Sequence, residues 1–150
     1  MARSSLEIVR DINRFDPLGG VWDELGALVE ELTNSAEPSL GVEALLGIFE
    51  RGAGIESGGG VFSDVLHALE QMPGYEPRLM KSLARRPAVF SVRMVDRLLR
   101  SGVSQIAGAS LIACLVECAN APTTVRIVRD EIRRVLANHD PAMLNRLKEQ

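Results

Sequence analysis

Apolar residues recur at helical spacing in almost every segment of this chain, and no segment alternates apolar and polar residues as a half-buried strand does. The clearest example is the run Val21, Leu25, Leu28 and Leu32. A run of this kind gives a helix one apolar stripe, and other helices have to cover that stripe. The sequence therefore predicts an all-α fold.

Proline, glycine and capping residues divide the chain into eight or nine expected helices. Ser4 and Glu7 have the spacing of a capping box, and Pro17 lies just beyond the end of that first helix. A short helix is expected from about Glu76 to Arg85, bounded by prolines on both sides. Ser91 is a candidate cap for the next one.

The last third of the chain carries three further expectations. Ser104 is expected to begin a helix that is apolar nearly all round and is buried centrally. Pro122 is expected to open the last long helix, because proline suits the first turn. The segment from Pro141 to Gln150 is expected to form a short final helix.

Short connections place successive helices antiparallel, so the helices are expected to pair as hairpins. Residues 1–150 then form a single helical domain of antiparallel hairpins, stacked as an irregular HEAT-like α-solenoid or as an orthogonal bundle. No strict sequence period is present, so a true repeat protein is not expected.

Residues 52–60 contain five glycines, and they are interpreted as a flexible Gly-rich connector, the most mobile internal segment. A phosphate-binding loop is excluded, because a helix precedes these glycines and no Gly-Lys-Ser/Thr follows. A connector that carries Glu56 could also serve as a binding loop.

The two halves of the chain carry opposite charge. Residues 1–76 hold 14 acidic against 4 basic residues, whereas residues 77–150 hold 6 acidic against 13 basic residues. Two interpretations stay open at this point. One end is built to meet a charged partner, or the halves pack together and partly neutralise each other.

Composition argues against several classes of partner. The net charge is −3, the isoelectric point is about 5.4 and only 4% of residues are aromatic, so nucleic-acid binding is not expected. This holds although arginines form helical stripes at 93, 97 and 100 and at 126, 129 and 133. The apolar run Ile106–Ala119 is too short to span a membrane, and Glu117 interrupts it.

We expect a cytoplasmic protein that is monomeric when free. Only two cysteines are present, and an acid, Glu7, follows the first residues before any apolar stretch, unlike a signal peptide.

No catalytic, metal or cofactor site is expected, so the chain is interpreted as a non-enzyme. Cys114 and Cys118 lie four residues apart on one helix, with poor geometry for a disulfide. The only histidines, His67 and His139, belong to no recognisable ligand set or catalytic group.

Acidic residues flank the glycine-rich segment with only Arg51 among them. Acid–base catalysis would need a pocket, whereas a protein-binding patch needs only concentrated charge. These residues are therefore the candidate partner-binding set: Glu43, Glu50, Glu56, Asp64 and Glu70. Tyr75 and Trp22 are candidate aromatic anchors, although Trp22 lies on an apolar stripe and fits the core better.

One stretch resembles a known family. After Leu69-Glu70 the chain reads Pro73-Gly74-Tyr75-Glu76, then a helix, an Arg85-Arg86-Pro87 break, and an apolar helix with Asp96-Arg97-Leu98-Leu99. This phrase, over residues 61–102, resembles the small all-helical immunity proteins encoded beside bacterial polymorphic toxins of the Rhs and contact-dependent inhibition type. Residues 1–40 match nothing in that family.

The resemblance implies an immunity protein that neutralises a cognate toxin by stoichiometric binding and by occlusion of its active site. It carries over no catalytic residue, because such proteins act as binders. A basic toxin domain is the expected partner, since an acidic surface attracts a positively charged active site. The alternative is a HEAT-like scaffold or adaptor that binds another cytoplasmic protein.

Overall fold

The computed structural model describes residues 3–148, and this part of the chain is almost entirely helical. Eight α-helices follow in the order α1 Ser5–Arg14, α2 Trp22–Thr33, α3 Val42–Arg51, α4 Val61–Glu70, α5 Tyr75–Arg85, α6 Val89–Arg100, α7 Leu111–Asn120 and α8 Arg126–His139. Short 3₁₀ helices lie at η1 Pro38–Gly41, η2 Gly58–Gly60 and η3 Pro141–Arg146. No helix within residues 3–148 is both long enough and apolar enough to cross a bilayer.

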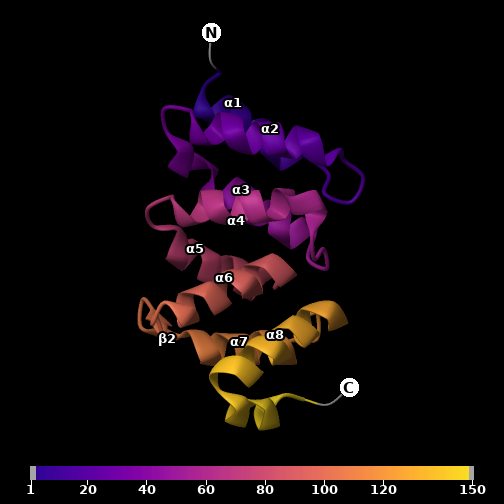
Figure 1. The fold of residues 1–150 in the computed structure, drawn as a ribbon, viewed down its shortest axis with the longest axis vertical. Coiled ribbons are helices and arrows are strands. Elements are labelled where there is room, and N and C mark those ends of the chain that lie inside the picture. The colour runs from indigo at the N-terminus through magenta and orange to yellow at the C-terminus, as the bar shows by residue number, and fades with distance from the viewer. Residues whose placement is uncertain (1–2, 149–150) are drawn as a thin grey trace.

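The helices form two layers that run the length of the molecule (Figure 1). The odd-numbered helices α1, α3, α5 and α7 each contact the next odd-numbered helix, and α2, α4, α6 and α8 do the same in the other layer. Each hairpin therefore packs mainly on the hairpins before and after it, as in a solenoid. The expected all-α fold is confirmed, and its arrangement is the stacked one.

The first helix shows how local sequence sets the ends of the elements. The Ser4 hydroxyl accepts a hydrogen bond from the backbone N–H of Glu7 at 3.2 Å, so the expected cap is present. At the other end, the Arg51 guanidinium donates to the carbonyls of Ile12, at 3.1 Å, and of Phe15. An arginine from the next hairpin thus adds hydrogen-bond donors to carbonyls at the C-terminal end of this helix.

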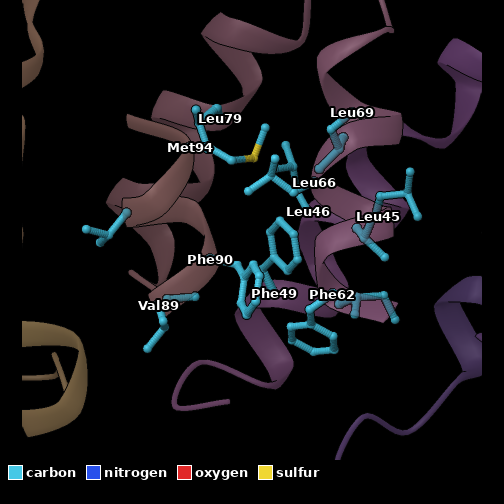
Figure 2. Close-up of a cluster of buried hydrophobic side chains, with 14 of the residues drawn as sticks. Leu45, Leu46, Phe49, Phe62, Leu66, Leu69, Leu79, Val89, Phe90 and Met94 are labelled. Carbon is cyan, nitrogen blue, oxygen red and sulfur yellow. The ribbon is translucent and has the colours of Figure 1, made fainter. Parts of the chain in front are cut away.

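Aromatic rings link the first three hairpins through the core. Trp22 lies 6.1 Å from Phe15 and 5.5 Å from Phe62, centroid to centroid. Phe49, Phe62 and Phe90 then contact one another at 5.2–5.5 Å (Figure 2). Contacts of this kind stabilise a core beyond the area they bury. Trp22 therefore has a packing role, as its place on the apolar stripe indicates.

The expectation that Ser104 begins a centrally buried helix is wrong. Gln105–Ile106 and Ala109–Ser110 form the small antiparallel strands β1 and β2, and the helix begins only at Leu111. Ala107 and Gly108 have φ angles of 51° and 82°, which suit a two-residue hairpin turn and not a helix. Helix α7 also lies toward the end of the stack, so it has too few neighbours for burial on every side.

Other boundaries shift by a few residues. Pro122 lies in the turn before α8, which begins at Arg126, and Val125 is 41% exposed. The rest of the expected apolar face of α8, at Val128, Ile132 and Val135, is fully buried. The final segment forms the 3₁₀ helix η3, and its last two residues lie outside the described part of the chain.

The glycine-rich segment 52–60 is packed along one edge of the stack. The Ala53 carbonyl accepts a hydrogen bond from the N–H of Val89 at 2.9 Å, and Gly54 approaches the side chain of Ile127. A Cβ on Gly52 would lie 3.3 Å from Pro17. The segment expected to be a flexible connector therefore contacts the other three hairpins, and we call it the seam. Its mobility stays a prediction.

Two glycines of this seam allow a matched test of packing. Gly58 and Gly60 both have positive φ, but a Cβ on Gly58 would lie 2.5 Å from the Phe62 ring, whereas Gly60 faces open space. We expect Gly60→Ala to lower the free energy of unfolding by about 1 kcal/mol through backbone strain alone. Gly58→Ala should lower it by about 2–4 kcal/mol, because overpacking adds to that strain. Urea denaturation of both variants measures the difference, and equal losses would contradict the packing of Gly58 on Phe62.

Candidate functional site

The structure divides the expected acidic set into two groups. Glu50 and Glu70 are mostly buried carboxylates held by arginines from the second half of the chain. Glu56 and Asp64 are exposed, and their carboxylates take part in no ion pair within the described residues. Glu43 belongs to neither group, because its side chain is half exposed and pairs with Arg85, which also binds Glu50.

Glu43, Glu50 and Arg85 join α3 to α5 in the odd-numbered layer. The Arg85 guanidinium donates to Glu50 at 3.0 Å and to Glu43 at 3.3 Å. The side chain of Glu50 is only 17% exposed, and it also accepts a hydrogen bond from the buried hydroxyl of Ser82 at 2.8 Å. The hydrogen bond to Glu50 raises the pKa of Arg85. Glu50 is therefore part of the packing between two hairpins.

Glu70 and Arg97 make the corresponding link between α4 and α6 in the even-numbered layer. Two hydrogen bonds, of 2.7 and 2.9 Å, hold the carboxylate in the fork of the guanidinium, and they raise the pKa of Arg97. Tyr75 lies nearby, mostly buried, and burial raises the pKa of its phenol. These residues line a shallow hollow of about 380 Å³ together with Leu98, Arg100 and Ser101. Glu70 and Tyr75 of the expected set therefore lie together at this hollow.

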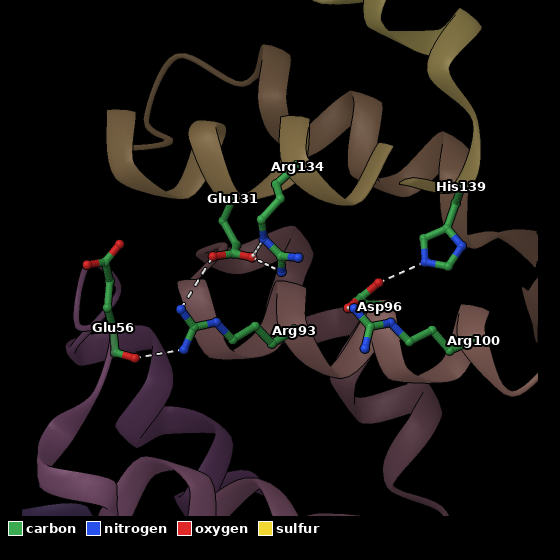
Figure 3. A network of polar contacts seen from close by, with 7 residues as sticks. All are labelled: Glu56, Arg93, Asp96, Arg100, Glu131, Arg134 and His139. Carbon is green, nitrogen blue, oxygen red and sulfur yellow. Dashed lines mark hydrogen bonds and ion pairs between the residues drawn. The ribbon is translucent and has the colours of Figure 1, made fainter. Parts of the chain in front are cut away.

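Arg93 makes a third link at the same level of the stack (Figure 3). Its guanidinium donates to the backbone carbonyl of Glu56 at 2.7 Å and to the carboxylate of Glu131 on α8 at 3.5 Å. The same guanidinium lies 4.8 Å from the centre of the Phe90 ring. The Glu56 carboxylate points away from Arg93, so this contact leaves its charge free.

The sequence analysis does not identify one buried and ion-paired aspartate, Asp96. Asp96 on α6 is only 4% exposed, and it binds His139 of α8 at 2.7 Å and Arg100 at 2.9 Å (Figure 3). Its position inside the apolar run of α6 is the one signal that could have indicated burial, because buried charges are usually paired. The contact joins the third hairpin to the fourth.

The exposed charges that remain unpaired are therefore distributed along the stack in the order of the chain. Arg85 and Arg97 neutralise acids at the junction between the second and third hairpins. Beyond that junction, acids remain exposed on α2 and α4, including Asp23, Glu30 and Asp64. The interpretation that the halves partly neutralise each other thus describes this junction, and the interpretation that one end meets a charged partner stays a prediction.

The exposed acids border a second hollow, between α2 and α4. Glu30 and Asp64 lie on its two sides, with Thr33 and His67, and its volume is about 440 Å³. Two carboxylates here give the even-numbered layer an acidic upper part. Such a surface can attract a basic partner and position it.

The cysteines fit a packing role. Cys118 is buried, and hydrogen bonding with Cys114 and burial both raise the pKa of its thiol well above the usual range. A thiol of raised pKa is a poor nucleophile at neutral pH. Among the described residues, no group of three or more His, Cys, Asp and Glu side chains could hold a metal ion.

Comparison with protein-family models, with curated proteins and with solved structures finds no match for this chain.

The two carboxylates that share Arg85 provide a test of their different roles. We expect Glu50→Ala to lower the free energy of unfolding by about 1–3 kcal/mol, because the buried Ser82 hydroxyl loses its acceptor along with the ion pair. Glu43→Ala should lower it by less than about 1 kcal/mol, since its exposed ion pair is weak. Thermal or urea unfolding measures both. A larger loss for Glu43→Ala would show that Glu50 is not the structural partner.

Proposed function

We propose that this protein is an immunity protein, which binds a cognate toxin domain in stoichiometric amounts and occludes its active site. The observation that carries the proposal is that Asp23, Glu30 and Asp64 on α2 and α4 are exposed and take part in no ion pair within residues 3–148. Arg85 and Arg97 pair with other acids instead. The resemblance of residues 61–102 to immunity proteins of polymorphic toxin systems supports the same assignment.

An acidic surface suits this role for a physical reason. Toxins that act on nucleic acids or nucleotides carry positive charge around their active sites, and complementary charge speeds encounter and fixes orientation. A protein bound over such a site also excludes the substrate. No turnover by the immunity protein is required.

Only some of the acids expected from the sequence are accessible to a partner. Glu56 and Asp64 are exposed and free to meet a partner, and Glu30 lies across the hollow from Asp64. Glu50 and Glu70 belong to the packing between hairpins. Reversing all five acids of the sequence-based set would therefore confuse a loss of binding with a loss of folding.

A scaffold or adaptor role is the second candidate. The two-layer stack of helices favours it, because stacked hairpins often present extended surfaces to protein partners. The gene neighbourhood separates the candidates, since an immunity protein needs a toxin domain encoded beside it.

The test uses the variant Glu30→Lys/Glu56→Lys/Asp64→Lys. Its association with the neighbouring toxin domain should be at least about tenfold slower at low salt, and less dependent on salt, because exposed charges act mainly on the encounter rate. Stopped-flow or surface plasmon resonance measures the rate, and survival on co-expression with the toxin measures protection.

The control is the variant Glu7→Lys/Glu37→Lys/Glu117→Lys, which changes the net charge equally at exposed positions away from the hollow. It should associate within about twofold of the wild-type rate. Circular dichroism checks that both variants fold. Full protection and wild-type association by a folded Glu30→Lys/Glu56→Lys/Asp64→Lys variant would contradict the acidic-surface mechanism.

A further inference from the structure

The turn between α1 and α2 presents two apolar side chains to solvent. Leu18 is 78% exposed and Val21 is 58% exposed, and the two are separated by Gly19 and Gly20. Glycines have no side chain that could cover the surface between them. The next residue, Trp22, is itself only half-buried. The turn therefore carries a small apolar surface that is open to a partner.

Hydrogen bonds within the turn fix its conformation. The Asp16 carboxylate accepts a hydrogen bond from the N–H of Leu18 at 2.9 Å, and the Asp16 carbonyl accepts one from the N–H of Gly20 at 2.6 Å. A Cβ on Gly20 would lie 2.5 Å from that carbonyl and 2.8 Å from the Phe15 ring. The turn can close this tightly only because Gly20 has no side chain.

Contacts with the second hairpin hold the same turn against the stack. Pro17 is buried, and a Cβ on Gly52 of the seam would lie 3.3 Å from it. Arg51 donates a hydrogen bond to the carbonyl of Phe15, just ahead of the turn. Leu18 is thus exposed on a backbone that is held in place. A surface of this kind loses little conformational entropy when a partner covers it.

The turn adjoins the acidic surface of α2 and α4. Val21 directly precedes α2, and Asp23 in the first turn of that helix lies on the same side as Glu30, seven residues further on. Glu30 borders the hollow between α2 and α4. Trp22 also contacts Phe62 of α4, with 5.5 Å between the ring centres. The apolar turn and the acidic hollow are therefore parts of one continuous surface.

The charge around the turn is mainly negative. Two arginines, Arg14 and Arg51, end the helices α1 and α3 at this edge, where the turn and the seam lie side by side (Figure 1). Against them stand four exposed acids whose carboxylates take part in no ion pair among the described residues: Asp16, Asp23, Glu24 and Glu56. Such a surface suits a positively charged partner.

We propose that Leu18 and Val21 are the apolar anchor of the toxin-binding surface, and that they enter an apolar pocket bordered by basic residues on the cognate toxin domain. This inference rests on the proposed function, and it names the part of the surface that retains the partner. Exposed acids act on the rate of encounter, whereas a buried apolar anchor determines how long the complex lasts.

A second copy of this chain is the less suited occupant. A two-fold contact through the turn would bring Asp16, Asp23 and Glu24 of one copy against the same acids of the other. Like charges placed opposite each other oppose association. A basic partner meets no such repulsion.

The test measures association and dissociation separately, by surface plasmon resonance with the toxin domain encoded beside this protein. Leu18→Ser/Val21→Ser should dissociate at least about tenfold faster than the wild type, because most interface substitutions act on dissociation. Its association should stay within about twofold of the wild-type rate, since no charge changes. The faster dissociation should persist in about 500 mM salt, because salt screens charges and not apolar contacts.

Two further variants serve as controls. Leu6→Ser/Leu40→Ser changes leucines that are 64% and 44% exposed at the opposite ends of α1 and α3, and it should dissociate at the wild-type rate. Leu18→Met keeps an apolar side chain of similar volume, so it should dissociate within about threefold of the wild-type rate. Circular dichroism and thermal unfolding establish that each variant folds.

The outcomes separate this inference from the proposed function. A wild type that binds the toxin, with a folded Leu18→Ser/Val21→Ser variant that dissociates no faster, overturns the inference and leaves the proposed function in place. Equally fast dissociation of Leu6→Ser/Leu40→Ser also overturns it, because the effect would not belong to the turn. A wild type that does not bind the toxin contradicts the proposed function, and the inference with it. A wild-type dimer in sedimentation that Leu18→Ser/Val21→Ser abolishes would instead assign the turn to a second copy.

Discussion

The junction between the second and third hairpins carries the interactions on which the rest of the structure depends. Arg85 links α5 to α3, Arg97 links α6 to α4, and Arg93 links α6 to the segment 52–60 and to α8. One arginine thus links the hairpins within each layer, and a third, Arg93, links them at the edge of the stack. Between them, Phe49, Phe62 and Phe90 form the apolar contact across the same junction. The acidic half and the basic half are joined here by charge on the outside and by aromatic rings within.

Stacking explains why the charge asymmetry of the sequence survives in the folded molecule. In a fold with many long-range crossings, the two halves would mix and their charges would neutralise across the surface. In a stack, hairpins mainly contact their neighbours, so residues far apart in the chain stay far apart in space. Within residues 3–148, the ion pairs between the acidic half and the basic half lie at the junction, and the outer hairpins keep exposed charge of their own. The place in the sequence where the charge changes sign therefore corresponds to a place along the stack, the junction between the second and third hairpins.

The sequence is informative where one physical rule dominates. Helical periodicity predicts the apolar faces of α1, α3, α4 and α6, because burial of a stripe is local information. It fails at 104–110, where Gly108 readily adopts the positive φ of a turn and Ala107 adopts one although alanine favours helices. For the candidate site, the sequence indicates which acids are concentrated but not which are paired. The pairing of Glu50 with Arg85 spans 35 residues, and only the stacking of α3 on α5 brings them together.

The unpaired acids of α2 and α4 have opposite energetic effects in the free protein and in a complex. Like charges on one face repel, so Glu30 and Asp64 contribute little to folding and raise the energy of the compact state. The chain does not lack arginines to neutralise them, since it has 15, and it places them where carboxylates are needed for packing. Unpaired arginines of α8 lie at the far end of the same layer, where they cannot reach these acids within one molecule. Charge that is unfavourable within one molecule becomes favourable against a second molecule of opposite charge, and this is the physical reason why we propose the acidic surface of α2 and α4 as the binding surface.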